Sequence, residues 1–181
     1  MKKFLKDILS TGIYLLVVLL ITYLIIVFVG QRTEVSGDSM EPTLSDGDNL
    51  IVDKISYRFR DPKRFDVIVF PFKYQKDTYY IKRIIGLPGE TVMIDKSGNI
   101  YIDGEILVES YGREIISMNK IGLAAEPITL GPDEYFVLGD NRNYSSDSRV
   151  IEVGNIKRDE IIGRAWLRIW PLGKFGFVSH Q

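Results

Sequence analysis

The sequence predicts a mainly β, antiparallel domain that is anchored by one N-terminal transmembrane α-helix. Two observations carry this prediction. Residues 8–31 contain no charged side chain and are mostly Leu, Ile and Val. After them the helical period disappears, and short runs rich in β-branched and aromatic residues alternate with turn residues. The remaining residues, 32–181, have the size of one ordinary domain.

The apolar stretch 8–31 is long enough to cross a bilayer. As a helix it would span about 36 Å at ~1.5 Å per residue, and the hydrocarbon core is about 30 Å thick. The apolar part of a cleaved signal peptide is shorter, about 7–15 residues, and ends in small residues. Because bulky side chains continue from Ile21 to Val29, we expect an uncleaved anchor.

The charges beside this stretch predict its orientation. Lys2, Lys3 and Lys6 precede the apolar residues, and only Asp7 opposes them. Positively charged flanks stay in the cytoplasm, so we expect residues 1–7 to form a cytoplasmic tail. The β-rich domain would then lie outside the cell membrane, in a single-pass protein.

The β-rich part contains seven predicted strands. Each is a short apolar or alternating run that ends near a turn residue or a proline. They cover residues 49–53, 66–70, 78–85, 91–94, 100–103, 135–138 and 161–170. Residues 95–99 are predicted to form a hairpin loop, and Asp103-Gly104 a second tight turn. The stretch from about 95 to 130 has fewer apolar residues in register and is predicted to be a flap or sub-lobe.

Composition excludes several classes of function. The chain carries 23 Lys and Arg against 24 Asp and Glu, a formal net charge of −1, whereas a nucleic-acid-binding protein is usually strongly basic. It has no cysteine, which excludes disulfides, thiolate nucleophiles and cysteine-based zinc sites. The one histidine, His180, lies near the C-terminus, where we expect a frayed end that could not hold a Ser-His-Asp triad in register. We predict no metal and no cofactor.

The segment Ser36–Leu44 presents a candidate nucleophile. It contains a Gly-Asp-Ser turn that is followed closely by Pro42. Such a turn can expose a hydroxyl group and a free backbone N–H together, which acyl transfer requires. The alternative interpretation is an ordinary solvated turn, and this segment alone does not exclude it.

The segment Tyr79–Gly89 presents a candidate base. Lys82 lies inside a strand-like run that is apolar on both sides. Because a strand alternates its faces, Lys82 and Arg83 point to opposite faces, and at least one of the two cations must lie against apolar surface. Burial disfavours the charged amine and lowers its pKa, which makes lysine a usable base near neutral pH. The alternative is an edge-strand lysine whose ammonium group reaches water.

The segment Gly139–Arg149 is a dense polar loop that follows an apolar strand. Its residues cannot form a core, so they either lie in water or build a hydrogen-bonded network. A cation site made from Asp140, Asn141 and Asp147 is a further alternative, although the spacing lacks the regular Asp/Asn/Gly pattern of a calcium-binding loop.

Together with the anchor, these segments resemble the type I signal peptidase family, whose members are serine proteases with a Ser-Lys dyad. Ser-Gly-Asp-Ser-Met-Glu-Pro-Thr resembles the nucleophile box of that family. Tyr-Ile-Lys-Arg-Ile-Ile-Gly-Leu-Pro-Gly resembles its lysine box, and Gly-Asp-Asn-Arg-Asn-Tyr-Ser-Ser-Asp-Ser-Arg its last box. One box is a weak signal, but three in the right order behind an N-terminal anchor are a strong one. The short length and single span resemble the compact form that is typical of Gram-positive bacteria.

The resemblance implies roles for individual residues. Ser39 would be the nucleophile and Lys82 the general base, while Ser145 would bond to the lysine amine and orient it. The resemblance also implies four supporting residues, namely Asp147 and Arg149, which brace the site, and Asp140 and Arg83, which pair with each other.

The resemblance further implies that substrate binds as an extended strand beside a small apolar pocket. The implied pocket residues are Val35, Met40, Leu44, Tyr80 and Ile81. The backbone N–H of Ser39 would donate to the oxyanion. Longer members of the family have a serine two positions before the nucleophile. Here that position is Gly37, which has no hydroxyl group, so the second donor is left open.

The implied function is that of a membrane-bound endopeptidase that removes N-terminal signal peptides from secretory preproteins at the outer face of the cytoplasmic membrane. Its implied partners are those signal peptides and membrane lipid, without nucleic acid, and the oligomeric state is left open. One alternative is a self-cleaving Ser-Lys peptidase of the repressor type, which needs a DNA-binding module where this chain has an apolar stretch. Another is a catalytically inactive β-rich membrane scaffold, which has no need of both Ser39 and Lys82.

Overall fold

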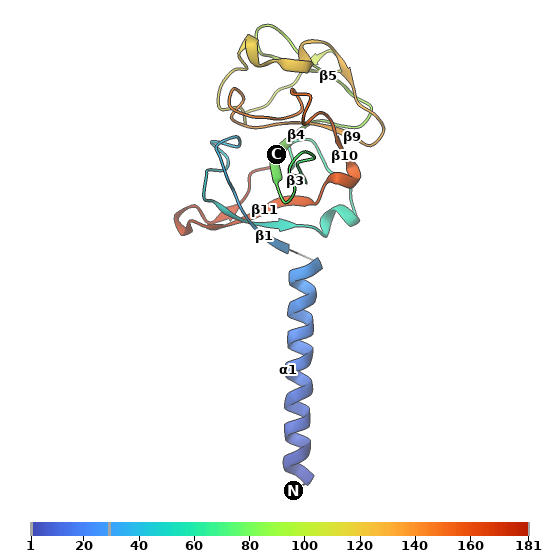
Figure 1. The fold of residues 1–181 in the computed structure, drawn as a ribbon, viewed down its shortest axis with the longest axis vertical. Helices are drawn as coiled ribbons and strands as arrows, with labels where there is room; N and C mark the ends of the chain where they lie inside the picture. Colours follow the sequence, from blue (N-terminus) through green and yellow to red (C-terminus); the bar gives the residue numbers. More distant parts are fainter. Residues whose placement is uncertain (1, 29, 181) are drawn as a thin grey trace.

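The computed structural model describes residues 2–28 and 30–180, which form one long helix and a β-rich domain (Figure 1). The helix is α1, Lys2–Phe28. The strands are β1 (Gly30–Glu34), β2 (Asn49–Asp53), β3 (Val67–Pro71), β4 (Tyr79–Gly86), β5 (Thr91–Ile94), β6 (Ile100–Ile102), β7 (Glu105–Ile106), β8 (Ile128–Thr129), β9 (Glu134–Leu138), β10 (Ile156–Lys157), β11 (Gly163–Trp170) and β12 (Gly176–Phe177). The short 3-10 helices are η1 (Ser56–Arg58), η2 (Met118–Lys120), η3 (Gly122–Ala125), η4 (Arg158–Glu160) and η5 (Leu172–Lys174).

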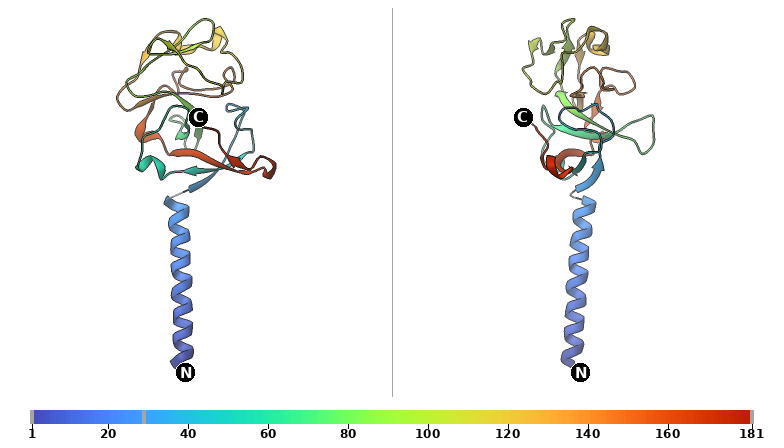
Figure 2. Two further views of the ribbon diagram at one scale, coloured as in Figure 1. Left: turned by 180° about the vertical axis from the view of Figure 1, so that it is seen from behind. Right: turned by 90° about the vertical axis from the view of Figure 1, so that its left-hand side faces the viewer.

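Helix α1 projects away from the β-rich domain (Figures 1 and 2). Its segment Lys6–Tyr23 has a mean hydropathy of 1.6 and is, by length and composition, apolar enough to cross a membrane. The helix differs from the predicted 8–31 at both ends. Residues 2–7, predicted as a tail, are helical because nothing in their sequence breaks a helix, and residues 30–31 instead begin β1. Residue 29 lies outside the described residues.

The larger sheet has eight strands in the order β1-β2-β11-β3-β4-β9-β10, with β12 paired to β11. Its pairings are antiparallel, as predicted. Strand β4 lies near its centre and pairs with β3 along residues 79–83. It pairs with β9 only from Arg83 onward, so residues 79–82 border β3 alone.

Strands β5 to β8 form a separate four-stranded sheet in the order β7-β6-β5-β8. This distal lobe, residues 91–129, lies between β4 and β9 in the sequence and farthest from α1 in space (Figures 1 and 2). Residues 95–99 connect β5 to β6 as a hairpin loop, and Asp103-Gly104 turns β6 into β7, as predicted. Most of the predicted sub-lobe, 95–130, falls within the distal lobe.

All seven predicted strands are present, and their ends differ from the prediction by two residues at most. The sequence did not predict β1, β7, β8, β10 and β12. Four of these have only two residues, which is too short to leave an alternating pattern. Strand β1 is polar, Gly-Gln-Arg-Thr-Glu, because it lies at the sheet edge and pairs only with β2.

The apolar core is divided among clusters that meet at β4. One cluster lies under the turn that follows β1 and contains Met40, Leu44 and Ile81. Another joins the distal lobe to β4 and β9 and contains Ile85 and Phe136. The turn after β1 and the distal lobe are therefore packed against different parts of β4, around Ile81 and Ile85.

A substitution at Gly86, the last residue of β4, would test this close packing. A Cβ atom there would stand 2.8 Å from Leu130 Cδ1 and 3.1 Å from Phe136 Cβ, so no side chain fits. We predict that Gly86→Ala lowers the free energy of unfolding by about 1–3 kcal/mol, because overpacking a filled core costs that much. Urea unfolding of the detergent-solubilised protein measures the change.

The matched control is Gly173→Ala, which adds the same methyl group in open space. Its free energy of unfolding should stay within about 0.5 kcal/mol of wild type. Equal stability of the two variants would contradict the packing described here.

Candidate active site

Ser39 lies in a tight turn directly after β1. Val35 N donates to Asp48 O at 2.8 Å, which closes the base of the turn. Gly37 has a φ of 86°, a left-handed conformation that favours glycine, and its N–H donates to Asp46 Oδ1 at 2.7 Å. The turn is thus fixed before and after the serine, and the Ser39 hydroxyl is held in one place.

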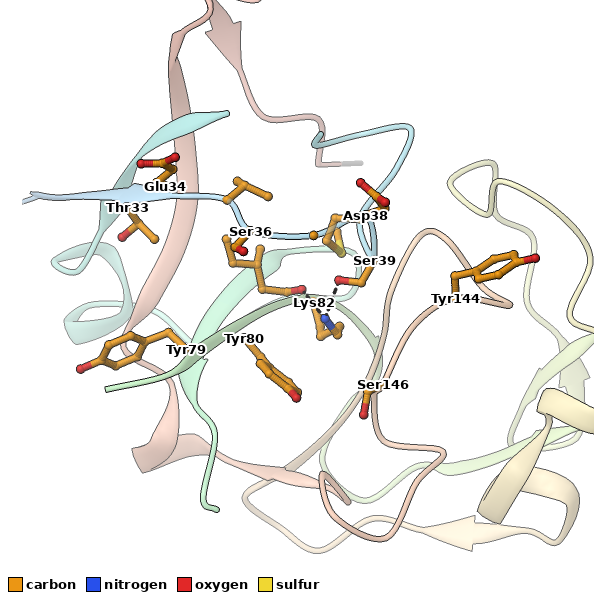
Figure 3. A pocket seen from close by; sticks show the side chains of 14 residues that line it. Thr33, Glu34, Ser36, Asp38, Ser39, Tyr79, Tyr80, Lys82, Tyr144 and Ser146 are labelled. Carbon is orange, nitrogen blue, oxygen red and sulfur yellow. Dashed lines mark hydrogen bonds between the residues drawn. The ribbon is translucent and has the colours of Figure 1, made fainter. Parts of the chain in front are cut away.

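The Ser39 hydroxyl meets Lys82, which comes from the middle of β4 (Figure 3). Lys82 Nζ lies 2.8 Å from Ser39 Oγ and also donates to the Ile81 carbonyl at 3.0 Å. The Tyr80 ring centre lies 4.9 Å from the same nitrogen, and Lys82 is only 4% exposed. The fold therefore brings the two predicted dyad residues into direct hydrogen-bond contact.

Burial controls the protonation of Lys82. Desolvation lowers the pKa of its ammonium group from 10.5 to about 8, while the negative charges of Asp147 and Asp140 act in the opposite direction. Near pH 8 a large share of Lys82 is therefore neutral and able to accept a proton. The alternative in which this lysine reaches water from an edge strand is wrong.

Arg83, the next residue of β4, is fully buried in an ion pair with Asp140. Its guanidinium group makes two hydrogen bonds to that carboxylate, Nε to Oδ1 at 2.8 Å and Nη2 to Oδ2 at 2.7 Å. Thr43 donates to Asp140 Oδ2 at 2.5 Å. This bond ties the turn that carries the predicted nucleophile, residues 35–48, to the ion pair, and we call that segment the nucleophile turn. The predicted pairing of Asp140 with Arg83 is confirmed.

The polar loop 139–149 is largely a buried network rather than a solvated loop. Asp147 is fully buried and accepts hydrogen bonds from Gly139 N at 3.0 Å and from the Arg149 guanidinium group at 2.8 Å. Arg149 also donates to the Lys120 carbonyl of the distal lobe at 2.9 Å. These bonds hold the loop in shape beside Lys82, which supports the bracing role implied for Asp147 and Arg149.

Ser145 differs from the expectation. Its hydroxyl group is buried but has no hydrogen-bond partner among the described residues, and the implied bond to Lys82 is absent. The lysine amine is directed instead to Ser39 Oγ and the Ile81 carbonyl. A Cβ atom on Gly139 would collide with both Ser145 Oγ and the Ser39 carbonyl oxygen, so Ser145 is packed against the site. Its role as the orienting partner stays a prediction.

A cavity of about 320 Å³ opens beside the dyad, between the nucleophile turn and the start of β4 (Figure 3). Four of the predicted pocket residues line it: Val35, Met40, Tyr80 and Ile81. Leu44 does not line it. The chain folds back after Met40, with Leu44 N bonded to Met40 O at 2.9 Å, and Leu44 is buried in the core beneath the turn. Tyr79, Tyr144 and Ser146 line the cavity and were not predicted.

The existing hydrogen bonds show which predicted backbone N–H groups are available to an oxyanion. The Gly37 N–H is bonded to Asp46, so this position supplies no free donor in the structure. The backbone N–H of Ser39 has no acceptor among the described residues. Of the two predicted positions, only Ser39 therefore has an N–H available to a substrate.

A segment of the distal lobe, residues 109–114, reaches the site and makes contacts that the sequence did not predict. The Tyr111 ring centre lies 3.7 Å from the guanidinium carbon of Arg83. Arg113 donates to Glu41 of the nucleophile turn at 2.6 Å. No local pattern marks these residues, because their partners are distant in the sequence and meet them only through the fold.

His180 is held firmly, contrary to the expected frayed end. Its Nδ1 accepts a hydrogen bond from Val67 N at 3.1 Å, which leaves Nε2 to donate to Ala165 O at 2.8 Å. The imidazole therefore packs between β3 and β11, whereas the partner of the Ser39 hydroxyl is Lys82.

The arrangement of carboxylates does not suit a cation. The alternative of a cation site at Asp140, Asn141 and Asp147 is wrong, because Arg83 and Arg149 occupy the two carboxylates. Within residues 2–28 and 30–180, no group of three or more acidic or imidazole side chains converges to hold a metal ion.

The sequence is similar to known proteins over most of its length. Residues 8–170 match the family described as signal peptidase, peptidase S26. The chain is 40% identical over 163 residues to a probable signal peptidase I-2 of Synechocystis sp.. The matched region covers 84% of this chain and 68% of that protein. It is 42% identical over 156 residues to a signal peptidase I of Leptolyngbya laminosa, and the match covers 82% of this chain and 73% of that protein. It is 38% identical over 159 residues to a signal peptidase I of Bacillus caldolyticus, and the match covers 83% of this chain and 85% of that protein.

Replacement of Lys82 by an apolar side chain tests the effect of its burial on stability. The folded state releases the Lys82 proton near pH 8 and the unfolded state near pH 10.5. Between these values the unfolded state binds more protons, so the free energy of unfolding of wild type rises with pH. Lys82→Met lacks this dependence. We predict that it is more stable than wild type below pH 8, by up to about 3 kcal/mol, and that the difference shrinks as the pH rises.

Chemical unfolding of both proteins across this pH range measures the difference. Using the difference between the two proteins removes the titration of other groups, which they share. A Lys82→Met variant that is less stable than wild type at neutral pH would contradict the conclusion that the buried ammonium group is costly.

Proposed function

Because the chain belongs to the signal peptidase family, peptidase S26, we propose that it removes N-terminal signal peptides from secretory precursors, with Ser39 as nucleophile and Lys82 as general base. The observation that carries the proposed dyad is the 2.8 Å contact between Ser39 Oγ and the buried amine of Lys82. The reaction is assigned to the outer face of the cell membrane.

The proposed chemistry is acyl transfer through Ser39. The neutral Lys82 amine accepts the Ser39 proton as Oγ attacks the scissile carbonyl carbon, and the ammonium group then gives that proton to the leaving amine. The carbonyl oxygen, negative in the intermediate, accepts the hydrogen bond of the Ser39 N–H. An ester between Ser39 and the signal peptide remains. Lys82 takes a proton from a water molecule as that water attacks the ester carbonyl, and the ammonium group returns the proton to Ser39 Oγ as it leaves. This releases the signal peptide as a carboxylate and restores both the serine and the neutral amine.

The precursor is proposed to bind as an extended strand. Strand β1 lies at the sheet edge, and residues 79–82 of β4 pair with β3 alone, so two unpaired strand edges border the cavity. An extended peptide between them would direct alternate side chains into the cavity. The bulky walls of Val35, Tyr80 and Ile81 favour a small side chain beside Ser39.

The proposed location rests on α1 and on an exposed apolar surface. Ser39 lies at most about 36 Å from the end of α1, because extended chain advances only ~3.3 Å per residue after Phe28. The end of β11 and the segment that follows it lie in the part of the domain nearer α1 (Figure 1). They expose Trp170, Leu172 and Phe175, each by more than half. Aromatic side chains favour the membrane–water interface. The lysines at the start of the chain support a cytoplasmic N-terminus.

The nucleophile assignment predicts the effect of Ser39→Ala. This variant should lose cleavage of a precursor protein, because alanine has no hydroxyl group to attack the carbonyl. Its free energy of unfolding should change by about 1 kcal/mol or less, the net value of one hydrogen bond. Mass spectrometry of the released mature protein measures cleavage. Ser97→Ala, at an exposed serine of the 95–99 loop, is the matched control and should cleave like wild type. Cleavage by Ser39→Ala near the wild-type rate would remove Ser39 from the mechanism.

The base assignment predicts a pH dependence. Only the neutral amine of Lys82 can accept the serine proton, so the cleavage rate should rise with pH through a midpoint near the lowered pKa of about 8. Lys82→Arg should be inactive, because a guanidinium group keeps its proton at these pH values. Initial rates on one precursor at several pH values test both statements. A rate that does not change across this range, or turnover by Lys82→Arg, would exclude Lys82 as the base.

A further inference from the structure

A second cavity, of about 270 Å³, continues the active-site cavity toward α1. It is lined by residues from several strands, namely Gln31 and Thr33 of β1, Val52 of β2, Lys54 after β2, Val69 of β3, Tyr79 of β4 and Ile162 before β11. Thr33 and Tyr79 also line the cavity beside Ser39. The two cavities therefore form one continuous groove between β1 and β4, which we call the β1–β4 groove.

The β1–β4 groove has a defined direction relative to the helix. Gln31 lies three positions after Phe28, the end of α1, whereas Ser39 borders the other end of the groove. A precursor whose apolar segment lies beside α1 would have to run from the Gln31 end to Ser39. The unpaired edges of β1 and β4 border this path, so an extended chain can bind there through its backbone.

The charges along the groove differ between its two ends. Glu34 and Asp38 line the part beside Ser39, and both are exposed. Lys54 lines the part near Gln31, and among the described residues no carboxylate pairs with its ammonium group. An acidic side chain of a bound peptide would therefore be attracted at the Lys54 end.

We propose that the Lys54 end of the β1–β4 groove is a separate peptide-binding subsite. It holds the precursor residues that lie between the apolar segment and the small-residue pocket, and it selects an acidic side chain over a basic one there. This inference rests on the proposed function, because it assigns a further specificity determinant to the same reaction.

The position of the selected residue can be estimated from the chain that borders the groove. The path from Gln31 to Ser39 is at most about 26 Å, at ~3.3 Å per residue. An extended precursor covers that length with about eight residues. The side chain that meets Lys54 therefore lies roughly four to eight positions before the cut, and alternation of faces restricts it to every second position within that range.

The experiment is a charge scan of one precursor against two forms of the full-length enzyme. A single Asp or Lys is placed at each of positions four to eight before the cut, and kcat/KM is measured in an uncharged detergent at physiological salt, so that no anionic lipid competes for Lys54. Wild type should prefer Asp over Lys about two- to fivefold at one position of this range, the ratio expected of a partly exposed ion pair. Lys54→Glu should reverse that preference at the same position, and Lys54→Met should abolish it.

The control is Lys96→Glu, which changes the net charge equally at an exposed residue of the distal lobe. It should keep the wild-type preference, which separates a local contact from a general effect of charge. If no position shows a preference that reverses in Lys54→Glu, or if Lys96→Glu reverses it equally, the subsite is refuted while precursor cleavage still stands. Loss of all precursor cleavage by wild type would refute the proposed function itself.

Discussion

Strand β4 buries two consecutive basic side chains, and the arrangement of the site follows from that constraint. Lys82 is 4% exposed and Arg83 is fully buried, on opposite faces of the strand. A buried charge without a partner costs several kcal/mol, so each cation must be compensated. The charge of Arg83 is compensated by the Asp140 carboxylate, which accepts two hydrogen bonds from the guanidinium group. Lys82 has no such carboxylate in contact within the described chain, so burial lowers its pKa instead. One step along the strand thus separates a buried ion pair from a buried amine whose pKa is lowered to about 8.

The same constraint explains why distant segments converge on β4. Asp140 can reach Arg83 only if the polar loop 139–149 folds beside β4, and this brings Asp147 near Lys82. Thr43 completes the bonding of Asp140 and so fixes the turn that carries the serine. A buried polar network with unsatisfied groups destabilises a fold more than an apolar core does. This accounts for the many hydrogen bonds that the loop makes to backbone groups. The distal lobe belongs to this arrangement, because its Tyr111 covers the guanidinium group.

The sequence predicted those features that leave a local pattern. Alternating runs located the central strands, and an apolar strand that contains a lysine indicated a buried amine. Other features depend on tertiary contacts. Two-residue strands such as β7 and β10 exist only because a neighbouring strand pairs with them. Leu44 carries no mark that separates a pocket wall from the core behind it, and Ser145 could not be given a bonding partner from its position in the loop. His180 looked frayed because its hydrogen-bond donor in β3 and its acceptor in β11 are distant in the sequence.

The connection between α1 and the site limits how the enzyme can meet its substrate. Strand β1 begins two positions after Phe28, which leaves no room for a long linker. The same strand borders the groove, and the chain continues from it into the turn that holds Ser39. One short segment therefore joins the apolar helix, the free edge of β1 and Ser39, the proposed nucleophile. The distance from the end of α1 to Ser39 is therefore limited by a short stretch of chain, most of which is β1 and the turn after it. A free edge strand risks pairing with other chains. The proposed pairing of β1 with the precursor gives a reason why this edge is left free.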